Sequence, residues 1–159
     1  MLPVQNDLIP YNPLPSDIML TYAIQKAGYD YDQLDQQGAI DFDGFMHAIN
    51  TFPWAEQLRA WDETQDGPLP SLVLQNEKDE RALWVMVIGS DLGNSFQVTA
   101  VWMRPHKGMF GLGKEKMVQE TATIDIELRQ ELDQLCRLFC AAQYEDLERD
   151  VARFSERSS

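Results

Sequence analysis

The pattern of apolar and polar positions divides the chain into a helical first part, an alternating middle part and a helical last part. Residues 16–28 carry apolar side chains at spacings that suit a helix face, although they form no clean stripe, with Ser16 suited to the N-cap and Gly28 to the end. Four further apolar residues at helical spacing predict a second short helix: Phe42, Phe45, Met46 and Ile49. Pro53 suits the first turn of a third helix over residues 53–63.

The middle part predicts about four strands, at residues 71–75, 81–89, 95–104 and 116–126. The second and third of these are expected to form an antiparallel hairpin around a turn at 90–94, and a Gly-rich loop is expected at 105–113. From Leu128 onwards the apolar positions return to helical spacing, with a break near Ala142 and Gln143.

This order of elements predicts an α+β fold with N-terminal helices, an antiparallel sheet of about four strands, and C-terminal helices packed on one face. A length of 159 residues favours a single domain spanning 1–159. Its four prolines make residues 1–15 an irregular N-terminal arm, and the composition of residues 62–70 (DETQDGPLP) predicts an internal loop.

The distribution of charged residues indicates what kind of partner the protein binds. The formal net charge is −13, and residues 1–58 hold eight acids against Lys26 alone. Only residues 104–116 (RPHKGMFGLGKEK) reverse the sign, with four bases against one acid; whether they form a second contact or an internal counter-charge stays open. So acidic a surface repels nucleic acid and suits a basic protein partner, which its field can steer.

The composition of the N-terminal residues and the low number of cysteines predict the compartment. Residues 1–15 have neither the basic nor the continuous apolar region of a signal peptide, and no apolar run reaches the length of a membrane span, so we expect a cytoplasmic protein without membrane contact. Cys136 and Cys140 are four residues apart and are expected to be small apolar residues of a helix, not a disulfide or metal pair. Whether the chain is a monomer or a dimer stays open.

Two segments resemble ligand-binding motifs and then depart from them. Residues 108–115 (GMFGLGKE) follow a phosphate-binding loop until Glu115, where a Ser or Thr is needed, and a strand follows where a helix belongs. Residues 35–45 (DQQGAIDFDGF) resemble half of an EF-hand loop, but Gly44 stands where the bidentate Glu belongs. We interpret the first as a hairpin loop and the second as a solvated acidic turn or an acidic docking face.

Nothing else in the chain indicates catalysis. His47 and His106 have no local partners at metal or triad spacing, and hydrolase, zinc-protease, thiol-redox and dinucleotide fingerprints are missing from the sequence. We therefore expect no enzymatic activity, no cofactor and no metal.

The candidate site is a surface for a basic protein, formed by acids and two tryptophans that lie seven residues apart on the third helix. Tryptophans rimmed by carboxylates are typical of a binding hot spot, although core packing is an alternative for each Trp. The candidate partner-binding residues are Asp30, Asp32, Asp35, Asp41, Asp43, Trp54, Trp61, Asp62, Glu63 and Asp66.

From about residue 40 the layout resembles the small immunity proteins of bacterial polymorphic toxin and type VI secretion effector systems. The resemblance rests on FPW and a second Trp at 52–61, PSLVLQ, a two-strand segment ending in WMRP, MFGLGK, and a terminal LFCAAQYEDLE helix. It implies a non-enzymatic, cytoplasmic protein that binds a cognate toxin and blocks it. The charge fits a nuclease toxin, whose cleft is basic because it binds phosphate.

Two alternatives from other classes stay open. A secretion chaperone or adaptor is also small, acidic and α+β, and would be a dimer that holds an effector segment. An unrecognised hydrolase would use the acidic residues 30–43 and would need a pocket of carboxylates with perturbed pKa values.

Overall fold

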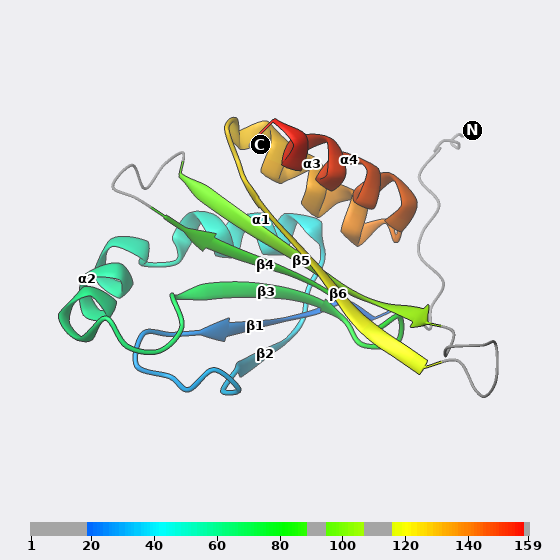
Figure 1. The fold of residues 1–159 in the computed structure, drawn as a ribbon. Coiled ribbons are helices and arrows are strands. Elements are labelled where there is room, and N and C mark those ends of the chain that lie inside the picture. Colours follow the sequence, from blue (N-terminus) through cyan, green and yellow to red (C-terminus); the bar gives the residue numbers. More distant parts are fainter. Residues whose placement is uncertain (1–18, 89–94, 107–115, 158–159) are drawn as a thin grey trace, which may run out of the picture.

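The computed structural model describes residues 19–88, 95–106 and 116–157, which form one six-stranded antiparallel sheet with helices against it (Figure 1). The strand order is β2-β1-β3-β4-β5-β6, so β2 and β6 are the two edges. The strands are β1 Thr21–Gln25, β2 Asp35–Ala39, β3 Ser71–Asn76, β4 Arg81–Val87, β5 Phe96–His106 and β6 Lys116–Asp125. The helices are α1 Phe42–Thr51, α2 Trp54–Thr64, α3 Arg129–Cys140 and α4 Tyr144–Glu156.

One face of the sheet carries the core, because its side chains alternate with period two. Buried residues of β4 and β5, such as Leu83, Val85 and Val98, meet the apolar faces of the helices, including Phe139 of α3. Figure 1 shows α1, α3 and α4 on this face, whereas α2 lies beyond the end of the sheet where β1 stops. Trp84 is on the opposite face and is only half-buried.

The N-terminal helix predicted for residues 16–28 is wrong where the structure describes that segment. Thr21–Gln25 is strand β1, which pairs with β2 on one side and with β3 on the other. Tyr22 and Ile24 pack against the core, so the relevant period is two, and the helical spacings in so short a segment are coincidental. Gly28 lies in the following turn with φ +91°.

The prediction of a sheet of about four strands is also wrong, because the sheet has six and the prediction lacked β1 and β2. β1 has a free hydrogen-bonding edge, and Asp35–Ala39 pairs with this edge as β2, although an acidic turn was predicted there. The loop predicted at 62–70 begins late, because α2 continues to Thr64. The predicted turn at 90–94 and nearly all of the predicted Gly-rich loop at 105–113 lie outside the described residues, but Pro105 and His106 still belong to β5.

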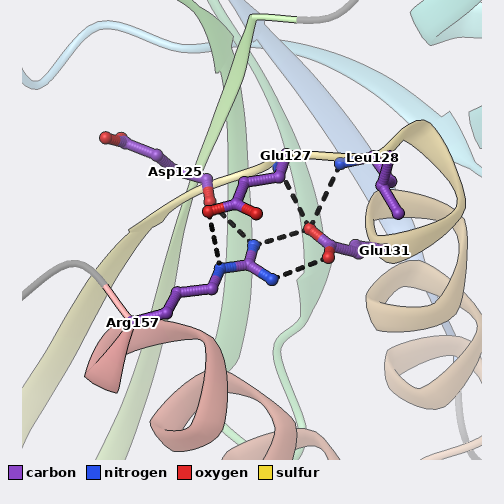
Figure 2. Close-up of polar contacts among 5 residues, drawn as sticks. All are labelled: Asp125, Glu127, Leu128, Glu131 and Arg157. Carbon is purple, nitrogen blue, oxygen red and sulfur yellow. Dashed lines mark hydrogen bonds and ion pairs between the residues drawn. The ribbon is translucent and has the colours of Figure 1, made fainter.

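The remaining elements confirm the sequence pattern. Helices α1 and α2, strands β3 to β6 and the β4–β5 antiparallel pairing lie where periodicity places them. The C-terminal helices α3 and α4 break at Ala141–Gln143, where Ala142 has φ +57°. A cluster around Arg157 then ties the end of α4 to the end of β6 and the start of α3 (Figure 2).

Candidate partner-binding surface

The turn between β1 and β2, residues 26–34, is held by one buried side chain. Gln25 is 2% exposed, and its amide nitrogen donates to the carbonyl oxygens of Asp30, Tyr31 and Gln33 at 3.3, 3.1 and 3.2 Å. The Gln33 side chain in turn accepts from the Asp30 N–H at 3.2 Å. Neutral amides thus fix the turn, and no carboxylate of the turn is used to do so.

Helix α2 lies beside this turn. Gln57 Oε1 accepts from the Ala27 N–H at 2.9 Å. After α2, Trp61 Nε1 donates to the Gly67 carbonyl at 3.1 Å, which fixes the chain where it passes the turn. Gly67 has φ +82°, and a Cβ there would lie 3.1 Å from the Tyr29 carbonyl oxygen. Only glycine fits this backbone conformation and close approach without strain.

These contacts bring two segments of the sequence into one acidic surface. We call it the acidic end and define it as residues 26–35 together with residues 62–66. Five of the candidate residues on it are exposed acids, contributed by the turn and by α2 with its following loop: Asp30, Asp32, Asp62, Glu63 and Asp66. Asp35, the first residue of β2, is the sixth and is also exposed.

The carboxylates of the acidic end are uncompensated, unlike those of the C-terminal half. Residues 19–66 hold nine acids and only two bases, Lys26 and Arg59. Among the described residues, the arginine ion pairs lie from residue 81 onwards, for example Arg81 with Glu148 at 2.6 Å and Arg153 with Asp150 at 3.1 Å, and none of them engages a carboxylate of the acidic end. The acidic end therefore presents its charge to solvent.

An aromatic side chain lies in the middle of this charge. Tyr31 stands between Asp30 and Asp32 and is 74% exposed. A large exposed aromatic on a fixed turn is a residue type and a setting that binding hot spots favour. Tyr31 is not among the residues predicted from the sequence, although its place in the triplet DYD is a signal that could have identified it.

The two tryptophans proposed as anchors have other roles. Trp54 is 7% exposed, its ring stacks edge-on against Phe52 and Phe96, and its Nε1 donates to the Ile49 carbonyl at 2.9 Å. It is a core residue and offers no surface to a partner, so its assignment as an anchor is wrong. Trp61 is half-buried and positions the chain at Gly67.

Asp41 and Asp43 are not part of the acidic end. Both lie at the start of α1, on the far side of β2 from the turn, and Figure 1 shows α1 beginning at the opposite end of the sheet from α2. Asp41 is the N-cap of α1 and accepts from the Gly44 N–H at 2.8 Å. An acid at this position stabilises the helix by capping and by its dipole, which accounts for Asp41 without a ligand.

The motifs that suggested ligands find no support in the described residues. The EF-hand-like segment is strand β2 followed by the cap of α1, and within the described ranges no three His, Cys, Asp or Glu residues are grouped to hold a metal. The phosphate-loop-like residues 108–115 lie outside those ranges. Cys136 and Cys140 are free thiols in α3, and burial raises the pKa of Cys140 to about 12.

A cavity of about 310 Å³ lies at the β3–β4 turn, away from the acidic end, with Asn76 and Arg81 in its lining. Asn76 is fully buried, but its amide nitrogen already donates to Asp79 and to the Tyr144 hydroxyl at 3.1 and 2.7 Å. Arg81 lies over the Tyr144 ring and pairs with Glu148. The side chains of Asn76 and Arg81 are therefore already engaged with other residues of the chain.

Comparison of the chain with protein-family models, with curated proteins and with solved structures found no match. Within the described part of the chain, none of the helices has both the length and the apolar character needed to cross a membrane.

Proposed function

We propose that this chain is a non-enzymatic binding protein that neutralises a basic toxin, and that it contacts the toxin through the acidic end. The observation that carries the proposal is the set of solvent-facing, unpaired carboxylates around Tyr31 on a turn fixed by Gln25. A turn that is already ordered pays little conformational entropy on binding, and its charge steers a basic partner.

The chemistry of the surface points to the kind of toxin. Five exposed carboxylates beside an exposed phenol ring present anionic and aromatic groups together. A nuclease binds phosphates and bases with basic and aromatic residues, so its cleft is complementary to such a surface. The toxin in this proposal is therefore a nuclease whose substrate cleft the acidic end covers, in a cytoplasmic encounter.

The experiment is affinity capture from lysate of the source organism with three tagged chains. The first is the wild type. The second carries Asp30→Asn, Tyr31→Ala and Asp32→Asn, and the third carries Glu77→Gln and Glu80→Gln, two exposed acids of the β3–β4 turn. We expect the wild type and the third chain to retain one basic protein at low salt and lose it progressively at high salt. We expect the second chain to retain little of it.

The captured protein is then expressed alone and with each chain in a bacterial host. The proposal requires that it arrests growth, and that the wild type and the Glu77/Glu80 chain restore growth better than the Asp30/Tyr31/Asp32 chain. Capture of a harmless partner held through an unfolded segment would instead support a secretion chaperone. Equal capture by all three chains would show that the acidic end is not the contact surface.

A further inference from the structure

The two edges of the sheet differ in how well they are protected. Edge β2 has five exposed residues, an irregular register against β1 at Tyr22/Ala23, and Gly38 with φ +104°. Edge β6 has ten residues and pairs with β5 without a register shift, from Asp125 opposite Gln97 to Lys116 opposite His106. Short and irregular edges resist pairing with another chain, whereas a long regular edge is a template for it.

The direction of the backbone groups of β6 can be read from its last residues. The Ile126 N–H donates to Phe96 at 2.9 Å, so even-numbered residues turn their backbone groups towards β5. The Asp125 carbonyl points the other way and accepts from Arg157 Nη2 at 3.3 Å, as Figure 2 shows. The outward groups of residues 117–123 have no such partner among the described residues, so Arg157 covers only one end of the edge.

The side chains along β6 suit a strand with the same alternation. Val118, Ala122 and Ile124 lie on the core face together with Glu120, and Met117 shares the other face with the polar residues at 119, 121 and 123. Met117 and Val118 are 50% and 36% exposed, so a strand added at this edge would bury apolar surface. A strand that continues both faces must be mainly apolar on one side and mainly polar on the other, as β6 itself is apart from Glu120 and Met117.

We propose that two copies of this chain pair antiparallel through β6, about a two-fold axis at Thr121, into one continuous sheet. A two-fold interface must complement itself, and β6 does so in charge: Lys116 lies at one end and Asp125 and Glu127 at the other. An axis at Glu120 would place two carboxylates opposite each other, whereas an axis at Thr121 places each Glu120 opposite Ala122 of the other copy.

The net charge of −13 does not oppose this pairing, because the acidic end is at the other edge of the sheet. The turn that carries Tyr31 joins β1 to β2, and five strand spacings of about 4.8 Å separate β2 from β6. This is roughly 24 Å, about three Debye lengths at physiological salt. The dimer would carry its two acidic ends at opposite outer edges, both free to bind.

The oligomeric state and a single-cysteine variant test the proposal. We expect wild-type protein to sediment at twice the 18.3 kDa chain mass at micromolar concentration. In Thr121→Cys, the two introduced thiols would face each other across the axis with Cα atoms about 5.5 Å apart, within disulfide range. We expect mild oxidation to give a disulfide-linked dimer on a non-reducing gel.

Gln119→Cys is the matched control, since it lies on the same face of the same strand. Its two copies would be separated by four residues along the strands, about 13 Å, too far to bridge. Cys136 is buried and the pKa of Cys140 is raised to about 12, so both native thiols react slowly. A monomeric wild type up to about 100 μM, roughly a hundred times the dissociation constant expected of a stable dimer, would overturn the proposal. Equal crosslinking of both variants would overturn the register.

Discussion

The prediction that probes the acidic end most deeply concerns Gln25, which carries no charge. Replacement by Leu keeps most of the side-chain volume and removes the amide. The amide has two protons and three carbonyl acceptors, so it is equivalent to two hydrogen bonds. At about 1 kcal/mol net for each bond, Gln25→Leu should lower the free energy of unfolding by about 2 kcal/mol. In a chain of this length that corresponds to a midpoint temperature roughly 4–8 °C lower.

The assay is urea unfolding followed by far-UV circular dichroism, together with amide hydrogen exchange of residues 29–34. Gln36→Leu is the control, because Gln36 is an exposed neighbour on β2 and the same chemical change there should stay within about 0.5 kcal/mol. We expect faster exchange of the turn in Gln25→Leu alone, and weaker partner binding although every acid is retained. The reasoning is refuted if both variants unfold at the same urea concentration and exchange alike.

Three further predictions concern stability. Arg157→Ala should lower the free energy of unfolding by about 1–2 kcal/mol at pH 7, because the guanidinium lowers the pKa of Glu131 from 4.5 to about 2. This contribution is complete above pH 4.5 and is lost as the pH falls towards 2, so the urea unfolding curves of variant and wild type should converge at low pH. Curves that stay equally far apart at all pH values would contradict this prediction. Trp54→Ala should lower the free energy of unfolding by about 3–5 kcal/mol in the same assay, since the ring is buried. A loss below about 1 kcal/mol would contradict a core position for Trp54. Gly67→Ala should cost about 1–2 kcal/mol through positive φ and the approach to Tyr29, and a more stable variant, measured by its melting temperature, would argue against that geometry.

The sequence predicted those elements whose side-chain pattern is strong. Strands β3 to β6 alternate or are wholly apolar, and α3 and α4 have wide apolar faces, so periodicity located them. It could not locate β1 and β2. Five residues are too few to separate period two from period 3.6, and β2 (DQQGA) has no apolar alternation at all. β2 is a strand because β1 offers it a hydrogen-bonding edge, which is a tertiary cause.

The candidate site was predicted in its charge but not in its geometry. Counting acids identified the segments 30–35 and 62–66, and the Gln57 and Gly67 contacts that join them depend on the fold. The sequence could not tell an exposed aromatic from a buried one. Trp54 packs inside while Tyr31 stands in solvent, and a seven-residue spacing fits a core helix face as well as a binding face.

The most direct test of the central claim is a titration of the captured basic partner with wild type and with the Asp30→Asn, Tyr31→Ala, Asp32→Asn chain, by calorimetry at low and high salt. Loss of a hot spot of about 2 kcal/mol should raise the dissociation constant roughly thirtyfold at low salt. The salt dependence should also weaken, because two charges are gone. An unchanged dissociation constant with an unchanged salt dependence would contradict the account and place the contact elsewhere on the molecule.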